Sequence, residues 1–518
     1  MQKDMQERLQ ALEDIRQKAL QGGGQKRIDR QHAKGKFTAR ERLGRLLDPG
    51  TFSEVGMLIG YQKNLPGEGI VTGHGSIDGR EVSIFASDAT VAGGSTGMDH
   101  GFKIYKAVER ALDNKVPLIS LYESPGARAY RMDQPDEVFY EKSVDSVFFP
   151  HVQASGLVPQ IAAMLGPNAG ASVYWAALQD FIIMVDGISQ MFITGPRVTK
   201  SVIGEDVTME ELGGARLHTR ISGVADWRVP NEDDCFKLIK RLLSFIPQNS
   251  DEKPPRVNTG DDPNRLCTQI EEIVPLAMSK PYDMRAVMKD IVDNGDLLEV
   301  KPEYAQEIIV AFGRLGGQTV GMVGNQPRVL AGGMTVKSSA KQARFMRFCD
   351  CFNIPIILLA DTPGYIPGTA SEKDGIIRSG AKILYAQCEA TVPKIAIICR
   401  KAYGGGQNGM GVAPGMGTDF VFCWPTADVG VMGDKQTVEL LYNDDINKSA
   451  NPDKTRQDLI EAYRKRYGNP FEAASLGRLG IEDVFAPRET RRRLIQSLRL
   501  LQNKRQARYT KRHGNIPL

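Results

Sequence analysis

The chain has 518 residues, of which 41% are hydrophobic and 25% charged, a composition typical of a globular protein with more than one hydrophobic core. Its net charge of +4 is too balanced for a dedicated nucleic-acid binder, and no apolar run approaches the roughly 18–20 residues of a membrane helix. The seven cysteines lack the spacing of a metal site or a disulfide framework. We expect a cytoplasmic protein without a metal site, direct membrane insertion or a nucleic-acid partner.

Residues 1–50 have the pattern of helices, and after them the sequence repeats itself. A hairpin-like pair of short strands around glycine stands near the start of each half, from Gly75 and from Gly313. The first pair is followed by Val91-Ala-Gly-Gly-Ser and the second by Leu330-Ala-Gly-Gly-Met. A helical stretch comes next in both halves.

The later landmarks of the two halves also correspond. Val116-Pro-Leu-Ile-Ser-Leu-Tyr-Glu-Ser-Pro-Gly matches Ile354-Pro-Ile-Ile-Leu-Leu-Ala-Asp-Thr-Pro-Gly, and each half then has Val-Pro, an apolar run and a glycine-rich loop. Each repeat closes on a glycine, Gly195 or Gly433. The spacing of roughly 240 residues predicts two copies of one fold, and the short β-branched runs that alternate with helical segments favour α/β units with buried strands.

The polar stretch between residues 247 and 265 is rich in Asn, Asp, Lys and Pro, as linkers are. We therefore place a domain boundary within it and expect one domain over residues 1–255 and a second over residues 256–518. Each domain carries an additional helical segment, at the N-terminus of the first and at the C-terminus of the second. The C-terminal segment is basic, from Arg491 to Arg508, and we interpret it as a solvated helix face.

Two glycine-rich loops follow buried strands, Gly166-Pro-Asn-Ala-Gly-Ala and Tyr403-Gly-Gly-Gly-Gln-Asn-Gly. A glycine turn that opens a helix presents free backbone N–H groups at the positive end of the helix dipole. Such groups can stabilise an oxygen that becomes negative during a reaction. The alternative is that these glycines only make tight turns, but their matching positions in a duplicated fold favour two oxyanion sites.

Other motifs carry less weight. Asp361-Thr-Pro-Gly resembles a nucleotide switch, but the chain has no phosphate-binding loop of the G-x-x-x-x-G-K-[ST] type. Gly93-Gly-Ser-Thr-Gly97 fits a nucleophile elbow, yet Met334 stands at the position matched to the serine. Lys289 lies in the pattern of an amphipathic helix and is interpreted as a surface residue rather than a biotinylated lysine. Glu123 is the acid that can be placed beside a strand-end loop of the first half.

Around these loops the sequence resembles the carboxyltransferase subunits of propionyl-CoA and methylcrotonyl-CoA carboxylases and of the sodium-pumping acyl-CoA decarboxylases. The resemblance covers nearly the whole chain. It implies two tandem crotonase-like (ClpP/crotonase) domains, each an α/β structure built as a β-β-α superhelix, in a homo-oligomer that is usually a hexamer. The matching segments include Lys36-Phe-Thr-Ala-Arg-Glu-Arg-Leu, Phe192-Ile-Thr-Gly-Pro, Glu211-Leu-Gly-Gly-Ala-Arg, Asp374-Gly-Ile-Ile-Arg-Ser-Gly-Ala-Lys and Trp424-Pro-Thr-Ala.

The resemblance also implies the site. The N–H groups of Gly170 and Ala171 would hold the thioester oxygen of an acyl-CoA in the first domain, and those of Gly405 and Gly406 the ureido oxygen of biotin in the second. Active sites would form between the first domain of one subunit and the second domain of another. The further residues implied are Ser124, Gly126, Ala127, Arg128, Asn168 and Asn408 for the substrate, and Gly364, Tyr365, Gly404 and Gln407 for biotin.

The implied reaction moves a carboxyl group between carboxybiotin and the α- or vinylogous γ-carbon of an acyl-CoA through an enolate. Biotin is carried by a separate carrier or biotin carboxylase subunit, and its nitrogen removes the acyl proton. The alternative within the family is a decarboxylase subunit that runs the reverse transfer. A hydratase-like enzyme or a non-catalytic scaffold on the same fold also stays open. Pro125, Asn168 and the pair Gln407-Asn408 depart from the common family pattern, which leaves the acyl group open.

Overall fold

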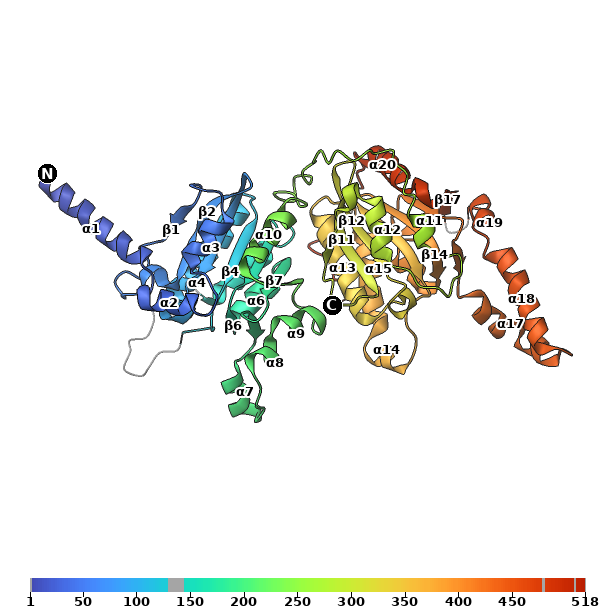
Figure 1. The fold of residues 1–518 in the computed structure, drawn as a ribbon, viewed down its shortest axis with the longest axis horizontal. Coiled ribbons are helices and arrows are strands. Elements are labelled where there is room, and N and C mark those ends of the chain that lie inside the picture. Colours follow the sequence, from blue (N-terminus) through green and yellow to red (C-terminus); the bar gives the residue numbers. More distant parts are fainter. Residues whose placement is uncertain (1, 129–143, 478–479, 507–508, 518) are drawn as a thin grey trace. The chain divides into compact units, whose positions relative to one another are not determined.

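The structure is a computed structural model that describes residues 2–128, 144–477, 480–506 and 509–517. The chain divides into two compact units, Met1–Glu252 and Lys253–Leu518, called unit 1 and unit 2 below (Figure 1). Within the described ranges no helix is both long enough and apolar enough to cross a lipid bilayer. A cytoplasmic location stays a prediction from the sequence.

Unit 1 is built on a seven-stranded sheet with the order β1-β2-β3-β4-β5-β7-β9. A tight hairpin joins β2 to β3 through Asp78 and Gly79, which both have positive φ (49° and 75°), as the two-residue turn of a twisted hairpin requires. From β3 onward the strands are parallel, and the three central strands are buried along their whole length because helices cover both faces. The strands are β1 (Ser53–Val55), β2 (Ile70–Ile77), β3 (Arg80–Ser87), β4 (Leu118–Tyr122), β5 (Gln160–Met164), β6 (Pro167–Ala169), β7 (Phe181–Val185), β8 (Gln190–Phe192) and β9 (Trp227–Val229).

Helix α4 (Met98–Asp113) of unit 1 buries one apolar stripe. In this helix the buried residues Ile104, Ala107, Val108 and Ala111 recur at the spacing of one helix face, and they pack on the sheet in the same core as Phe85 and Tyr122. The other helices are α1 (Gln2–Leu20), α2 (Gln25–His32), α3 (Ala39–Leu46), α5 (Phe148–Ala154), α6 (Ala171–Ala177), α7 (Pro196–Ile203), α8 (Met209–Gly213), α9 (Ala215–Arg220) and α10 (Glu232–Leu243).

Unit 2 repeats this topology with the order β10-β11-β12-β13-β14-β15-β17, and β16 pairs with the end of β14. Gly316 and Gly317, both with positive φ, make the hairpin that corresponds to Asp78 and Gly79. The long strand β14 covers the positions that are divided between β5 and β6 in unit 1. The strands are β10 (Leu298–Val300), β11 (Ile308–Leu315), β12 (Gln318–Asn325), β13 (Ile356–Thr362), β14 (Lys394–Tyr403), β15 (Phe420–Cys423), β16 (Asp428–Gly430) and β17 (Ile481–Val484).

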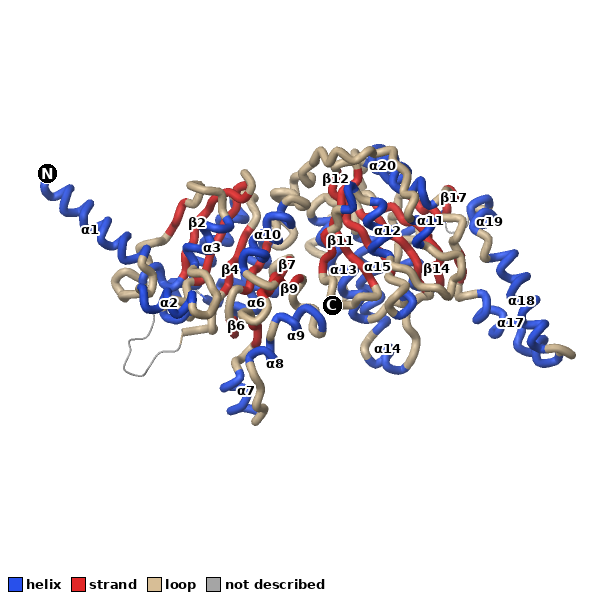
Figure 2. The backbone as a smooth tube through the Cα atoms, in the orientation of Figure 1, coloured by secondary structure: helices blue, strands red, loops and turns tan. Residues whose placement is uncertain are grey.

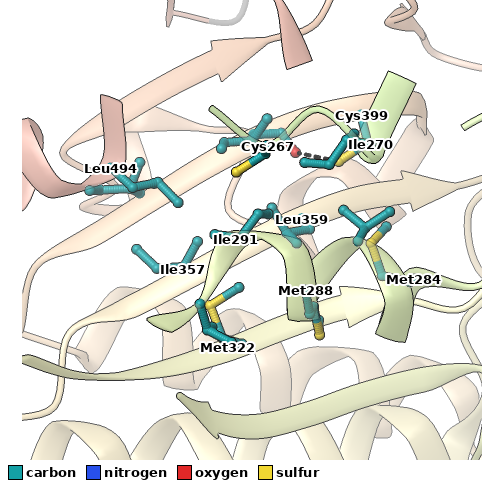
Figure 3. Close-up of a cluster of buried hydrophobic side chains, with 14 of the residues drawn as sticks. Cys267, Ile270, Met284, Met288, Ile291, Met322, Ile357, Leu359, Cys399 and Leu494 are labelled. Atoms are coloured by element: carbon teal, nitrogen blue, oxygen red, sulfur yellow. Dashed lines mark hydrogen bonds between the residues drawn. The ribbon is translucent and has the colours of Figure 1, made fainter. Parts of the chain in front are cut away.

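Both faces of the unit 2 sheet are covered, as the tube in Figure 2 shows. On one face Met284, Met288 and Ile291 pack against Ile357 and Leu359 of the sheet (Figure 3). On the other face Phe312 contacts Phe345 and Phe348 of α13. The helices are α11 (Ile270–Ile273), α12 (Met284–Ile291), α13 (Val336–Cys351), α14 (Thr369–Lys373), α15 (Ile376–Glu389), α16 (Gly404–Gly409), α17 (Asp434–Lys448), α18 (Pro452–Tyr467), α19 (Pro470–Ser475) and α20 (Thr490–Leu501).

In one segment the structural correspondence between the two units differs by one residue from the correspondence that the sequence match gave. The short 3-10 turns that follow β3 and β12 span Ala92–Gly94 and Leu330–Gly332, so Ala92 corresponds to Leu330. Both residues take the left-handed conformation, with φ of 48° and 49°. The sequence match aligned one Ala-Gly-Gly with the other because the three residues are identical. The counterpart of Ser95 is therefore Gly333, not Met334.

From the sequence we expected both Lys289 and Arg491 to be exposed, and the structure confirms this for only one of them. Lys289 is exposed on α12, which confirms its interpretation as a surface residue. Arg491 is instead fully buried in α20 and makes an ion pair with Asp293 (2.6 Å). The interpretation of the basic C-terminal segment as a solvated face is therefore wrong at Arg491, where a guanidinium links the last helix to the turn after α12.

Candidate active site

The first glycine loop lies where β6 ends and α6 begins. Gly170 has φ 65° and ψ −131°, which glycine adopts most readily, and its N–H donates to the carbonyl of Ile193 (3.1 Å). Ala171 is the first residue of the helix, and its N–H has no acceptor among the described residues. The loop therefore presents the N–H of Ala171, whereas the N–H of Gly170 is used within the fold.

The second glycine loop has the same form at the end of β14. Strand pairing aligns Ala169 with Phe192 in unit 1 and Tyr403 with Gly430 in unit 2, so Gly170 corresponds to Gly404, which has φ 53°. Gly405 is then the counterpart of Ala171, one residue away from the sequence match. The N–H groups of Gly405 and Gly406 have no acceptor among the described residues and open α16, as unpaired donors at a helix start do.

The loop from Ser124 to Arg128 lies against the first glycine loop. The N–H of Thr96 donates to Gly126 O (2.9 Å), Ala127 forms an isolated bridge with Thr96, and the buried Ser124 hydroxyl lies 3.1 Å from that of Thr96. Gly126 has φ 105°, and a Cβ atom there would lie 3.0 Å from the carbonyl oxygen of Ala169. Glycine is therefore required for the close approach of the two loops.

Asn168 and Arg128 hold this loop in place. Asn168 is fully buried; its amide oxygen accepts from Ser124 N–H (3.0 Å) and its amide nitrogen donates to Gly166 O (2.7 Å). Arg128 donates to the hydroxyl and carbonyl oxygens of Ser95 (3.2 and 3.0 Å) and makes an ion pair with Glu68. The sequence predicted both as substrate contacts, whereas the structure shows Asn168 bonded within the fold.

Glu68 was not found from the sequence. It is buried beside the strand β2, in the left-handed conformation (φ 58°), and burial raises the pKa of its carboxyl group while the ion pair with Arg128 opposes that shift. A non-glycine residue with positive φ is uncommon, but single-sequence patterns do not reveal it. Gly67 and Glu68 begin no recognisable motif.

The corresponding loop in unit 2 carries a tyrosine where unit 1 has Ala127. Met334 N–H donates to Gly364 O (3.0 Å), and the following residue, Tyr365, lies over the start of α16. A Cβ atom at Gly405 would lie 3.4 Å from Cε2 of Tyr365, and one at Gly380 would lie 3.1 Å from its hydroxyl oxygen. Burial raises the pKa of Tyr365 to about 12, so the ring is neutral and forms an apolar wall.

Two polar atoms of the residues around the second glycine loop have no hydrogen-bond partner among the described residues. They are the hydroxyl of Tyr365 and the side-chain oxygen Oε1 of Gln407, both buried. A Cβ atom at Gly406 would lie 2.8 Å from Cα of Gly364, so the two backbones touch there. Asn408 is partly exposed. The structure therefore brings Gly364, Tyr365, Gly405 and Gln407 together at one strand end.

The acids at the strand ends are neutralised. Glu123 is buried and makes ion pairs with Lys36 and with Arg42 (2.7 Å). Its counterpart Asp361 is fully buried against Arg400 (2.9 Å). Both carboxylates are therefore engaged in ion pairs within the fold. In the part of the chain that the structure describes, no group of three His, Cys, Asp or Glu side chains could hold a metal ion.

The fold and these loops define the class of protein. Each unit is an α/β crotonase-like domain in which a helix N-terminus presents backbone donors at the end of a buried strand, and the two units form a tandem pair. The sequence profile of the carboxyl transferase domain matches residues 30–516. The chain belongs to the carboxyl transferase family.

Relatives match along the whole chain. The carboxyltransferase subunit of propionyl-CoA carboxylase from Haloferax mediterranei is 47% identical, covering 99% of this chain and all of the relative. The alpha subunit of methylmalonyl-CoA decarboxylase from Veillonella parvula is 45% identical, with 99% of both chains covered. The crystal structure of a hexameric transcarboxylase 12S with methylmalonyl-CoA bound matches with a TM-score of 0.92 at 43% identity, covering 99% of this chain and 98% of that one.

These matches confirm the fold class and the reaction class that the resemblance implied. The chain is a biotin-dependent acyl-CoA carboxyltransferase. Biotin is its cofactor, carried on a separate subunit, and CoA is part of its substrate. The roles of single residues stay predictions.

Proposed function

We propose that this chain transfers a carboxyl group between biotin and a three-carbon acyl-CoA, interconverting propionyl-CoA and methylmalonyl-CoA. The observation that carries the proposal is that full-length relatives at 43–47% identity are named for these two acyl groups, whether they are carboxylases, decarboxylases or a transcarboxylase. Unit 1 holds the acyl-CoA and unit 2 holds biotin.

In unit 1 the N–H of Ala171 donates to the thioester oxygen. Removal of an acyl α-proton places negative charge on that oxygen, and an N–H fixed at a helix start stabilises the charge without reorganisation. Asn168 and Arg128 act indirectly, because they fix the loop that closes over this oxygen. Glu123 takes no part as a base, since Lys36 and Arg42 hold it as a buried carboxylate.

The residues of unit 2 fit biotin. Gly405 leaves space beside the flat wall of Tyr365, and the N–H groups of Gly405 and Gly406 are free to bind the ureido oxygen. The buried Oε1 of Gln407, from the same loop, has no hydrogen-bond partner among the described residues. Bound biotin supplies the nitrogen that carries the carboxyl group and accepts the acyl proton. This chain orients that nitrogen and stabilises charge on the ureido oxygen.

The reverse direction is the second candidate function, favoured by the 45% identity to a decarboxylase subunit. The same site serves both directions, because the enolate and the ureido anion are stabilised in either case. The partner decides between them: carboxylation needs a biotin carboxylase subunit with its biotin carrier, whereas decarboxylation needs a membrane pump. Affinity purification of the chain from its own cells tests this, since one partner or the other should accompany it.

We expect Asn408 to contribute to acyl-chain choice, because it follows Gln407 in the second glycine loop and its side chain is partly exposed. Changing one pocket contact alters discrimination by about 1–3 kcal/mol. Kcat/KM should therefore be measured for acetyl-, propionyl- and butyryl-CoA with the wild type and with Asn408→Ala. Propionyl-CoA should be the best wild-type substrate, and the variant should change the ratios roughly 10-fold or more. A wild-type preference for another acyl chain would contradict the proposal.

We also propose a homo-oligomer, a hexamer as in the transcarboxylase relative, joined through two apolar arms. The arm in unit 1 is α7, and its counterpart in unit 2 is α17; both begin after the glycines predicted to close the repeats. Each presents paired apolar side chains at the same helical positions, Val202 and Ile203 in one and Leu440 and Leu441 in the other, with 63–74% of each residue exposed. Such apolar surface marks an interface.

The assembly proposal has a direct test. Val202→Asp and Leu440→Asp each place a charge on an arm, so the mass measured by light scattering should fall below that of the wild-type oligomer. Leu276→Asp is the matched control, because Leu276 is 83% exposed but lies outside both arms. Unchanged mass in both arm variants would remove the arms from the interface.

A further inference from the structure

Unit 1 contains a buried ion pair at positions where unit 2 has uncharged residues. Glu68, in the turn before β2, is fully buried and pairs with Arg128, whose side chain is 10% exposed. Ile70 and Ile308 begin equivalent strands of the two hairpins, so Gln306 occupies the position of Glu68. Gln306 is exposed. The carboxylate of Glu68 is therefore a feature of one copy of the fold and not of the other.

The cation of this pair is also replaced in unit 2. Arg128 N–H donates to Thr96 O, and Ile366 N–H donates to Met334 O, both at 2.9 Å, so Ile366 occupies the position of Arg128. The main chain of this loop follows the same path in both units. An apolar side chain thus completes the loop in unit 2, where unit 1 has a guanidinium.

The residue beneath these side chains changes with them. Arg128 donates to the hydroxyl and carbonyl oxygens of Ser95 (3.2 and 3.0 Å). The counterpart of Ser95 is Gly333, and a Cβ atom at Gly333 would lie 2.3 Å from Cδ1 of Ile366. Apolar residues of similar volume can replace a buried ion pair without loss of stability. Unit 2 therefore indicates that the fold itself does not require the charges of Glu68 and Arg128.

Glu68 is also held in a strained conformation that unit 2 does not repeat. Its φ is 58°, whereas Gln306 does not have a positive φ. Two side chains of α4 hold the turn: Nδ1 of His100 donates to Glu68 O (3.0 Å), and the ammonium group of Lys103 donates to Gly67 O (2.8 Å). The buried Oε2 of Glu68 has no hydrogen-bond partner among the described residues. Backbone strain and incompletely satisfied buried groups are typical of functional sites.

We propose that Glu68 is a positioning residue for the first oxyanion site, because it fixes Arg128 and thereby the loop that ends there. The inference rests on the proposed function, in which Ala171 N–H stabilises the enolate oxygen. The loop accepts a hydrogen bond from Ala169 N–H at Ser124 O (3.1 Å), two residues before Ala171. A displaced loop moves the Ala171 donor away from charge that forms during the reaction, so the loss falls on kcat.

Glu68→Gln tests the role of the charge, because it keeps the shape of the side chain. It should lower kcat for transfer from methylmalonyl-CoA to a biotinylated carrier by about 10- to 100-fold. The Kd for propionyl-CoA and the KM for the carrier should stay within about 2-fold of the wild type. Glu299→Gln is the matched control and should keep the wild-type kcat, since Glu299 accepts from Arg285 at both carboxylate oxygens (2.6 and 2.8 Å) in unit 2.

A triple variant separates positioning from stability. Glu68→Gln, Arg128→Ile and Ser95→Gly together give unit 1 the residues that unit 2 has at these positions. The triple variant should melt within a few degrees of the wild type and show the same loss of kcat as Glu68→Gln. Wild-type kcat in the triple variant would overturn the inference. If the triple variant does not fold, kcat of Glu68→Gln, measured well below its melting temperature, decides alone.

Amide hydrogen exchange followed by mass spectrometry provides a readout that needs no activity. The N–H groups of Thr96 and Arg128 should exchange faster in Glu68→Gln than in the wild type, because their hydrogen bonds close the loop. If the wild type transfers carboxyl groups but Glu68→Gln has unchanged kcat or unchanged exchange, the positioning role alone fails. If the wild type transfers none with any acyl-CoA while exchange is faster in Glu68→Gln, the proposed function fails and the positioning of the loop stands.

Discussion

Gly405→Val should reduce carboxyl transfer at least about 100-fold, the effect of losing one oxyanion contact, while acyl-CoA binding stays within about 2-fold of the wild type. A Cβ atom at Gly405 would already lie 3.4 Å from the ring of Tyr365, so the two methyl groups of valine must project into the space beside the ring or displace it. Either outcome obstructs the group that binds at the N–H of Gly405. Transfer and acyl-CoA binding should be measured on the same preparation.

Two controls separate obstruction from misfolding. Gly415→Val makes the same change in unit 2 at a position with nothing within 4 Å of the added Cβ atom, and it should leave activity intact. Ala171→Val enlarges the structural counterpart in unit 1 and should weaken acyl-CoA binding instead. Gly170 is less suitable, because its φ of 65° strains any side chain. Loss of acyl-CoA binding in Gly405→Val, with biotin affinity intact, would reverse the assignment of the two units.

Arg42→Met should destabilise unit 1 by about 3–5 kcal/mol, because it removes the cation paired with the buried Glu232 and one of the two cations paired with Glu123. The guanidinium of Arg42 donates to both carboxylate oxygens of Glu232 (2.8 and 2.9 Å) and to Leu165 O (2.9 Å), and it makes an ion pair with Glu123 (2.7 Å). Glu232 lies at the start of α10 and Glu123 at the end of β4, so Arg42 joins α3 to both. Calorimetry should show the unfolding transition lowered by roughly 6–20 °C.

Arg45→Met is the matched control for this prediction. Arg45 lies one turn further along α3 and pairs with Asp233 (3.0 Å), and both side chains are about half exposed. An exposed ion pair contributes about 0–1 kcal/mol, so this variant should melt within a few degrees of the wild type. If Arg42→Met and Arg45→Met melted together, the buried pairs would contribute no more than a surface contact.

Much of the fold could be predicted from the sequence because duplication leaves matched landmarks. A Val-Pro dipeptide stands before a buried strand in both halves, and a glycine, Gly195 or Gly433, stands before a helix in both. These motifs mark equivalent positions without any knowledge of packing. The strands β4 and β13 are mostly apolar without strict alternation, which is how a strand with two covered faces is recognised. The two glycine loops could be predicted in the same way, because each follows a strand that has a counterpart in the other half.

Details that depend on three-dimensional contact could not be predicted. Leu330 takes a left-handed conformation that sequence patterns assign to glycine, so one register of the repeat was wrong by a residue. Which N–H of the glycine loop is free depends on Ile193, the residue that follows strand β8, because its carbonyl accepts from Gly170. Arg491 was interpreted as exposed because its partner Asp293 is far away in the sequence.

The central claim, that this chain itself moves a carboxyl group between an acyl-CoA and biotin, is tested most directly with labelled methylmalonyl-CoA. The purified chain should be mixed with methylmalonyl-CoA carrying ¹³C in its free carboxyl group, with and without a biotinylated carrier domain. The account predicts propionyl-CoA and ¹³C-labelled carrier when biotin is present, and unchanged substrate when it is absent. Folded, oligomeric protein that leaves the label in methylmalonyl-CoA with biotin present, or releases it equally well without biotin, would contradict it.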